Sequence, residues 1–318
     1  MPAQRPSTAV SVSSFDLFLL VYLGAVWGAA FLFFRIASPE VGPVWTAELR
    51  VALAGSALLI FTRRSALRTV RRHFWPIVFV GATFSAVPFT LLAFATLSLP
   101  ASLASVLMAT TPLFTALVGA VWLRQRLTFL VGVGLALGFG AVVILVGGAP
   151  IHLGPSTFLA FGAGLAASFS YAIAGTFVRR RLGEVPPLDL ATGQLLAAAG
   201  LLLPVAALSG PLAMPSPAAA GSLVTMAIIS TAIAWPAFFR VSRRSGATAA
   251  SSATFIVPLF GMLWGGLVLG ESIGPELVGG FALVAVSLVL VIQLPIPFIG
   301  RARVGATRLA ARLSASPA

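Results

Sequence analysis

Residues 101–123 read ASLASVLMATTPLFTALVGAVWL, and residues 247–269 read ATAASSATFIVPLFGMLWGGLVL. The two stretches are identical at 9 of 23 aligned positions, and both carry Pro-Leu-Phe at the same place. Shared apolar composition explains some of these matches, but it does not explain an aligned Pro-Leu-Phe. The chain therefore contains an internal repeat with an offset of 146 residues.

The likeness extends outward from this block. Residues 85–89 (SAVPF) align with residues 231–235 (TAIAW) at the same offset. At an offset of 144 residues two more pairs align, Trp27 with Tyr171 and Arg35 with Arg179. The repeat thus covers much of each half of the chain.

Composition indicates that the repeats lie in a membrane. Of the 318 residues, 59% are hydrophobic and 8% are charged, whereas a soluble domain carries about 25% charged residues. Ten apolar stretches are each long enough to cross a bilayer. We predict spans at 17–36, 43–61, 76–97, 101–121, 129–146, 157–178, 188–208, 219–239, 247–269 and 275–293. The first is too long for the apolar core of a cleaved signal peptide, so we expect it to be retained.

Arginines alternate between the connectors. Eighteen of the twenty basic residues, all of them Arg, fall at position 5 and in the segments 63–72, 124–126, 179–181, 240–244 and 301–312. These segments share one side of the predicted membrane, and the opposite connectors hold Glu40, Glu271 and Glu276. The positive-inside rule then places both termini in the cytoplasm. The net charge of +13 lies beside lipid headgroups, which predicts contact with anionic lipids and argues against nucleic acid.

Each half holds five predicted spans, and because five is odd, the second copy must enter the membrane inverted. The charges agree, since residues 124–126 (RQR) on the basic side align with residues 270–272 (GES) on the other. We predict an all-α polytopic membrane protein with ten transmembrane helices in two inverted five-helix repeats. Its parts are a cytoplasmic N-terminal tail (1–16), repeat 1 (17–146), an extracytoplasmic linker (147–156), repeat 2 (157–293) and a basic cytoplasmic C-terminal tail (294–318).

Several motifs carry a resemblance to a known family. They are Trp27-Gly28 with Phe31 and Arg35, then Arg50, the Ala-Ser and Pro-Leu-Phe block of the fourth span, residues 231–235, and residues 258–271. In order and spacing, over about residues 17–293, they resemble an EamA-type transporter of the drug/metabolite transporter superfamily. The resemblance implies ten helices around a central cavity and export of small metabolites such as amino acids. One motif departs: the first repeat usually ends in Gly-Glu, as the second does at Gly270-Glu271, and here it has Arg124-Gln125.

Three charged residues are embedded in the predicted spans: Arg35, Glu48 and Arg50. Such residues are costly in a bilayer and mark ion pairs or functional sites. One interpretation is an Arg35–Glu48 ion pair, with Arg50 bonded to backbone carbonyls. In the other, Arg50 holds a substrate carboxylate or Glu48 takes a coupling proton. The sequence leaves both open.

Hydroxyl residues near prolines form a second group of candidates. Pro112 and Pro258 each remove a backbone N–H, which frees the carbonyls of Met108 and Thr254 and bends the helix. Irregular backbone in a membrane is tolerated where it meets protein or lines a wet cavity, although small residues also serve close packing. The cavity interpretation assigns substrate contacts to Ser85, Ser105, Thr111, Thr231, Ser251 and Thr254.

Aromatic residues at roughly corresponding places in the two halves complete the predicted site: Trp27, Phe31, Phe89, Tyr171 and Trp235. They either wall a substrate pocket or pack the bundle. Four prolines are candidate hinges: Pro88, Pro112, Pro236 and Pro258.

Enzyme chemistry has little support. The chain has no cysteine, its two histidines lie in connectors, and the spans hold no metal-ligand cluster, phosphate loop or nucleophile–base pair. We expect no catalytic residue, metal or cofactor. The prediction is a secondary transporter, more specifically an exporter, of small organic metabolites such as amino acids or drug-like solutes, working by alternating access in a bacterial inner membrane. An intramembrane lipid-modifying enzyme and a passive channel are the alternatives, and a homodimer is left open.

Overall fold

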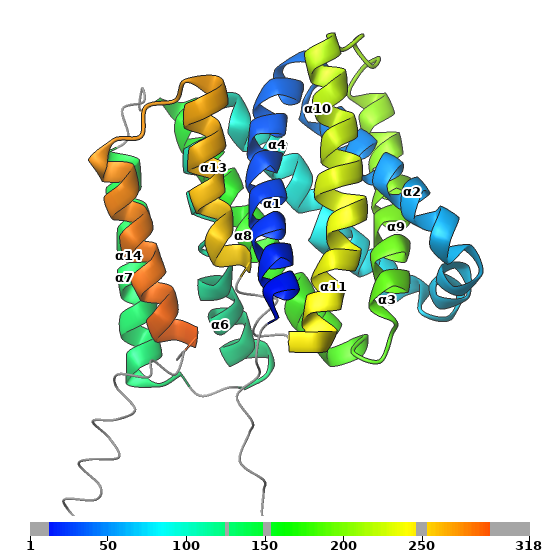
Figure 1. Cartoon of the computed structure of the whole chain (residues 1–318), viewed down its shortest axis with the longest axis horizontal. Helices are drawn as coiled ribbons and strands as arrows, with labels where there is room; N and C mark the ends of the chain where they lie inside the picture. The colour runs from blue at the N-terminus through cyan, green and yellow to red at the C-terminus, as the bar shows by residue number, and fades with distance from the viewer. Residues whose placement is uncertain (1–12, 125–126, 149–153, 246–252, 293–318) are drawn as a thin grey trace, which may run out of the picture.

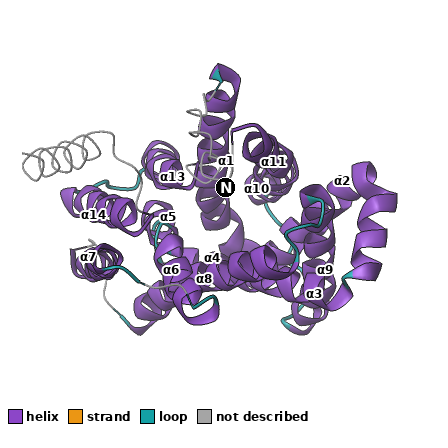
Figure 2. Ribbon diagram, turned by 90° about the horizontal axis from the view of Figure 1, so that it is seen from below, coloured by secondary structure: helices purple, strands orange, loops and turns teal. Residues whose placement is uncertain are grey.

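The computed structural model describes residues 13–124, 127–148, 154–245 and 253–292. Within these ranges every regular element is a helix, and the helices stand side by side as a bundle (Figure 1, Figure 2). Seven helical segments are long and apolar enough to cross a membrane. This architecture is that of a polytopic membrane protein.

The long segments are α1 (Ser14–Val41), α2 (Pro43–Arg72), α3–η1–α4 (Phe74–Gly81, Ala82–Ala86, Val87–Ser98), α5–α6 (Ala101–Met108, Thr111–Trp122), α8 (Pro155–Arg181), α9 (Pro187–Leu208) and α10–η2–α11 (Pro217–Ala227, Ile228–Ile233, Ala234–Ser245). The shorter apolar helices are α7 (Phe129–Gly148), α13 (Ala253–Leu269) and α14 (Pro275–Ile292). Each predicted span overlaps one of these segments, and the prediction was least accurate at the ends.

Helix α2 is longer than its predicted span. It continues from residue 61 through Arg72, so the basic connector expected there is helical. Residues 62–73 contain neither Gly nor Pro, and good helix formers prevail among them. The side chains of Ser65 and Thr69 also bond the Asp189 carboxylate on α9, at 2.7 and 3.3 Å. The extension is therefore held by packing as well as by propensity.

The two Pro-Leu-Phe segments behave differently. The fourth span is broken between α5 and α6, and the Thr111 hydroxyl donates to the Met108 carbonyl at 2.8 Å. That carbonyl is the one Pro112 was expected to free. In contrast, α13 continues through Pro258 without interruption. The described helices thus have a break at only one of the two prolines.

Two π-helical turns interrupt the third and eighth spans. They are η1 and η2, and they begin 146 residues apart, at Ala82 and Ile228. A proline follows each turn closely, Pro88 and Pro236. A missing N–H disturbs the i→i+4 ladder, and π turns are frequent at functional sites.

Helix packing relies on glycines. The main neighbours are α2 with α9, α7 with α14, α1 with α13, α4 with α8, and α5 with α13. A Cβ on Gly28 would lie 2.8 Å from the backbone of both Val257 and Gly261, so only glycine allows this approach of α1 to α13. At Gly134 a Cβ would lie 2.9 Å from the Ser287 carbonyl of α14. These contacts match the close helix packing that small residues permit in membranes.

Candidate functional site

Arg50 lies inside the bundle on α2, where only 5% of its surface is exposed. Its Nε donates to the Thr231 hydroxyl of η2 at 3.1 Å. Its guanidinium carbon lies 3.9 Å from the centre of the Phe89 ring and 5.2 Å from that of Phe34, which is cation–π geometry. Within the described chain, no hydrogen bond or ion pair engages its two Nη groups. Arg50 is thus held in place while its main anion-binding donors stay unused.

A second polar contact lies at a related place in the other half. The Ser85 hydroxyl of η1 donates to Gln194 Oε1 of α9 at 2.8 Å, and both residues are buried. Ser85 aligns with Thr231 at the offset of 146, and Gln194 aligns with Arg50 at the offset of 144. Each π turn therefore uses its hydroxyl residue to contact a polar side chain on α2 or α9.

Carbonyls of both π turns accept side-chain donors. The Thr83 carbonyl of η1 accepts from the Ser170 hydroxyl of α8 at 2.7 Å. In η2, the Ile229 carbonyl accepts from the Tyr22 hydroxyl at 3.2 Å, and the Ser230 carbonyl accepts from Trp27 Nε1 at 3.1 Å. These bonds satisfy backbone groups at the irregular turns, because unpaired polar groups are costly away from water.

An aromatic cluster adjoins Arg50. Its members come from α1, η1–α4, α8 and α11: Trp27, Phe34, Phe84, Phe89, Tyr171, Trp235 and Phe238. Phe89 connects Arg50 to the other rings of the cluster. It stacks with the Arg50 guanidinium, and its ring centre lies 6.5 Å from that of Tyr171. Trp27 and Trp235 are 6.4 Å apart. The predicted Trp27, Phe89, Tyr171 and Trp235 therefore do come together.

The interpretation that paired Arg35 with Glu48, one of the two left open by the sequence, is wrong. Arg35 Nη1 donates to the carbonyls of Thr96 and Leu97 at 2.6 and 2.9 Å. Arg50 was expected to bond carbonyls in the same interpretation, and it bonds a hydroxyl and two ring faces instead. Glu48 is 5% exposed, its Oε2 is sealed without a partner, and no cation of the described chain pairs with it. Glu48 and Arg50 do not pair either, because residues two apart on a helix point to nearly opposite sides.

Phe31 packs in the same apolar core as Phe34 and Phe89. The other predicted residues make no hydrogen bond or ion pair with Arg50 in the described chain; the Ser105 hydroxyl, for example, donates to the Ser102 carbonyl within its own helix. Thr111 bonds its own broken helix, as described above, and Thr254 is exposed at the start of α13. Ser251 falls outside the described residues, as does most of both predicted tails.

Sequence reasoning missed Gln194, Phe34, Phe84 and Phe238. Gln194 was findable, because it is a polar residue within an apolar span and it aligns with Arg50 at the offset that pairs Trp27 with Tyr171. The phenylalanines gave no such signal, since the chain has 24 of them. Among the described residues, no three His, Asp or Glu side chains are grouped so that they could hold a metal ion.

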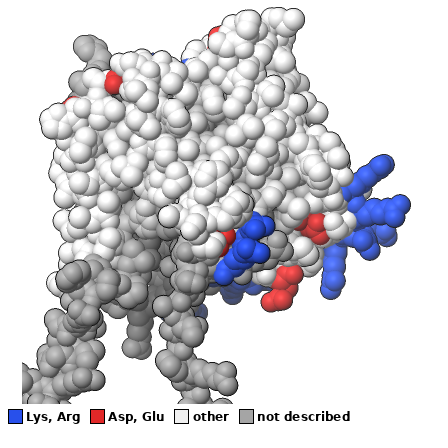
Figure 3. All heavy atoms as spheres, viewed as in Figure 1, with Lys and Arg blue, Asp and Glu red and all other residues white. Residues whose placement is uncertain are grey.

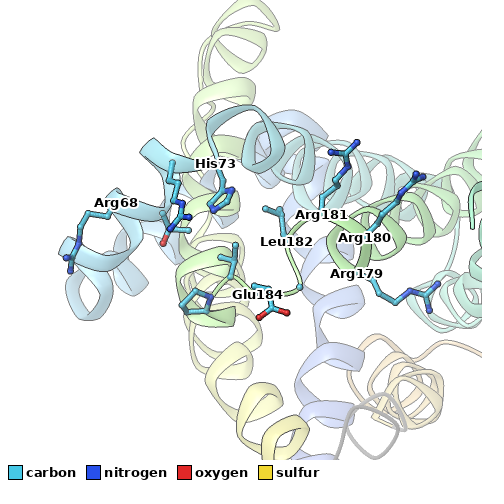
Figure 4. A pocket seen from close by; sticks show the side chains of 12 residues that line it. Arg68, His73, Arg179, Arg180, Arg181, Leu182 and Glu184 are labelled. Atoms are coloured by element: carbon cyan, nitrogen blue, oxygen red, sulfur yellow. The ribbon is translucent and has the colours of Figure 1, made fainter.

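A separate hollow of 460 Å³ lies at the arginine-rich end, away from Arg50. Figure 4 shows Arg68 and His73 on one side of it, Arg179–Arg181 on the other, and Glu184 on the connector between them. These arginines end α2 and α8, where the negative end of the helix dipole favours cations. Their guanidinium groups fan outward in Figure 4, so this hollow does not resemble a built anion site.

The fold and the relatives define a membrane transporter. Residues 15–147 and, separately, 158–293 match the EamA-like transporter family. The chain therefore belongs to this family, as the motifs predict, and through it to the drug/metabolite transporter superfamily.

Three relatives are named transporters. A probable terminal-alkyne amino-acid exporter of Streptantibioticus cattleyicolor is 27% identical over 265 residues, which is 82% of this chain and 88% of the relative. An S-adenosylmethionine/S-adenosylhomocysteine transporter of Chlamydia trachomatis is 27% identical over 277 residues, 81% of this chain and 83% of the relative. An uncharacterized transporter of Archaeoglobus fulgidus is 24% identical over 278 residues, which is 84% of this chain and 95% of the relative. A protein crystal structure aligns with a TM-score of 0.62 and 19% identity over 89% of this chain and 99% of that one, which supports the fold alone.

Proposed function

We propose that this chain is a secondary transporter that exports small carboxylate-bearing metabolites, amino acids among them, by alternating access. The observation that carries the proposal is Arg50, a buried cation that lies beside an aromatic cluster and whose Nη donors have no partner among the described residues. Arginine binds carboxylates through two parallel hydrogen bonds. A substrate carboxylate is the ligand that would complete this arrangement.

The aromatic walls suit the remainder of such a solute. Phe89, Tyr171, Trp27 and Trp235 offer ring faces and edges for an apolar or flat side chain. Within the described chain the Tyr171 hydroxyl has no hydrogen-bond partner, so a substrate can use it. The relative named as an amino-acid exporter supports this class of solute.

Matched contacts support ten helices in two inverted repeats. The π turns η1 and η2, the residues Ser85 and Thr231 with their partners Gln194 and Arg50, and the acceptor carbonyls of Thr83 and Ile229 recur at offsets of 144 to 146 residues. In inverted-repeat transporters the substrate binds at the repeat interface, where helices are irregular. Alternating access would then rock one half against the other, with Pro88 and Pro236 as hinges beside the π turns, and Pro112 and Pro258 as further candidates.

Orientation follows from charge. Figure 3 shows the arginine side chains gathered at one end of the molecule, whereas most of the visible wall carries none. We place that end in the cytoplasm of a bacterial inner membrane, by the positive-inside rule, with anionic lipids around it. Both tails, 1–16 and 294–318, would lie on that side.

Glu48 is the proposed coupling group. Because Oε2 of Glu48 is closed off from solvent and has no partner in the described chain, Glu48 is costly to keep ionised within a membrane. It would carry a proton in this conformation and release it when the bundle opens toward water. A passive facilitator would lack this coupling, and a pH gradient separates the two.

Counterflow in proteoliposomes tests the proposal. Labelled amino acids and simple carboxylic acids are offered to the wild type and to Arg50→Gln and Arg50→Lys, with melting temperature and monodispersity as folding controls. Arg35→Lys is the matched control, because Arg35 is also embedded but bonds backbone carbonyls. We expect saturable carboxylate transport that falls at least about tenfold in both Arg50 variants and is retained in Arg35→Lys. Equal transport by the wild type and Arg50→Gln would refute the role of Arg50.

A further inference from the structure

Gln194 is a buried amide that the proposed mechanism does not use. It lies on α9 and is 3% exposed. Its carbonyl oxygen accepts from Ser85, but within the described chain its amide nitrogen makes no hydrogen bond. Buried side-chain polar groups nearly always find partners, so an amide with idle N–H donors indicates a partner that comes and goes.

The idle donors are not sealed off. In the described chain, neither Nε2 of Gln194 nor the Nη groups of Arg50 belong to the buried polar atoms that lack both a partner and solvent access. Each therefore touches space that a water molecule can reach. A purely structural glutamine would use its amide N–H groups to donate hydrogen bonds to a neighbouring backbone carbonyl or hydroxyl group.

Gln194 and Arg50 both contact the same face of the η1–α4 segment. Gln194 contacts Ser85, and Arg50 stacks on Phe89 at 3.9 Å. Residues four apart on a helix lie one above the other, about 5–6 Å apart. The two side chains therefore contact the η1–α4 segment about one turn apart. The Gln194 contact lies nearer the N-terminal end of this segment than the Arg50 contact does.

The pairing of α2 with α9 gives the same order. A Cβ on Gly55 of α2 would lie 3.3 Å from Leu195 and 3.2 Å from Leu196 of α9, so Gln194 is nearly level with Gly55. Arg50 is five residues from Gly55 on α2, or about 7.5 Å at 1.5 Å per residue. Gln194 thus lies nearer the arginine-rich end of the bundle, and Arg50 nearer the other.

We infer that Gln194 is a second substrate anchor that determines specificity: Arg50 binds the carboxylate, and the Gln194 amide donates to a hydrogen-bond acceptor elsewhere on the same solute. The inference rests on the proposed function of Arg50. It narrows the substrates to metabolites with a carboxylate and a second polar group, such as a hydroxyl or amide, within about one helical turn's distance. Ser85 is a positioning residue, because it holds the carbonyl side of the amide and leaves the N–H donors free.

Isosteric substrate pairs provide the test. Threonine and valine, and asparagine and leucine, have similar shapes and differ in one polar group. A site built to bond a polar group rejects the analogue that lacks it. We expect the wild type to prefer the polar member of at least one pair by about tenfold or more in kcat/KM, measured by counterflow and by competition.

Gln194→Leu removes the amide and keeps an apolar side chain of similar size. We expect it to bring that preference close to one, while transport of the apolar member stays within about twofold of wild type. Ser85→Ala should reduce the preference less, and Gln194→Asn should lower it by misplacing the amide. The unchanged transport rate for the apolar member shows that the variant folds and still undergoes the conformational change of transport.

The outcomes separate the two proposals. A preference that survives Gln194→Leu, together with loss of all transport in Arg50→Gln, overturns the role of Gln194 alone. Equal loss of both members of a pair in Gln194→Leu means a structural role and also overturns it. Transport that does not depend on Arg50 overturns the proposed function itself.

Discussion

Glu271 closes the first turn of α5 by accepting a hydrogen bond from the Ala101 N–H at 2.7 Å, and its second carboxylate oxygen accepts from the Ser102 N–H at 2.9 Å. Free N–H groups and a positive dipole end favour a carboxylate at a helix N-terminus. The Gly-Glu motif that follows α13 in the second repeat thus fastens a helix of the first.

Glu271→Ala is expected to lower stability by about 1–2 kcal/mol, because the two amides of α5 lose their partner. Melting of the purified chain in detergent measures it. Glu276→Ala is the control, since Glu276 is an acid at the start of α14 and does not bond α5. Equal melting temperatures for Glu271→Ala and wild type would contradict the capping role.

Arg124 occupies the position that aligns with Gly270, and both have left-handed backbone, with φ of 53° and 66°. A residue with a side chain is destabilised by roughly 1 kcal/mol in the left-handed region, whereas glycine has no Cβ and avoids this cost. Arg124→Gly is therefore expected to raise the melting temperature, and Gly270→Ala to lower it. Opposite signs in the two variants are the diagnostic result, and shifts in the same direction would argue against backbone strain.

Gly28 is expected to tolerate no side chain. In Gly28→Ala the new Cβ would meet backbone atoms of α13 at 2.8 Å, and backbone cannot move aside cheaply. We expect a loss of about 1–3 kcal/mol, in the range of overpacked cores. Gly175→Ala on α8 is the matched control, because its Cβ would meet nothing within 4 Å. That change should be neutral or stabilising, since alanine favours helix.

Phe89 is expected to affect substrate affinity through Arg50. Phe89→Leu removes the ring face that supports the guanidinium, an interaction worth about 0.5–2 kcal/mol. KM for carboxylate substrates should rise several-fold, with a smaller change in kcat, because the anchor is misplaced rather than lost. Phe89→Tyr keeps the ring and should stay near wild type. If both variants behave alike in transport kinetics, the stacking is incidental.

Glu48→Gln tests proton coupling. The amide is neutral and nearly isosteric, so the variant should fold with a melting temperature close to that of wild type. We expect exchange between labelled and unlabelled substrate to persist, because it needs no net proton movement. Accumulation driven by an imposed pH gradient should be lost. Undiminished gradient-driven accumulation in the Glu48→Gln variant would assign coupling to another group or to none.

Local properties of the sequence determined much of this protein. Stretches of about 20 apolar residues specify membrane-crossing helices wherever they occur, and arginine segments between them mark one end of the bundle. The aligned blocks led to the pairs Trp27–Tyr171 and Ser85–Thr231, because a repeat is visible without knowing any contact. The alignment also contained the Arg50–Gln194 pair.

Only the tertiary structure decided which polar groups meet. Arg35 bonds carbonyls of α4, Arg50 stacks on Phe89, and Glu48 has no partner in the described chain, whereas the sequence allowed either an Arg35–Glu48 ion pair or functional roles for Arg50 and Glu48. Such contacts depend on how each helix is rotated and tilted against its neighbours. Rotation and tilt are set by packing, such as the approach of α1 to α13 at Gly28, and packing joins residues that lie far apart along the chain.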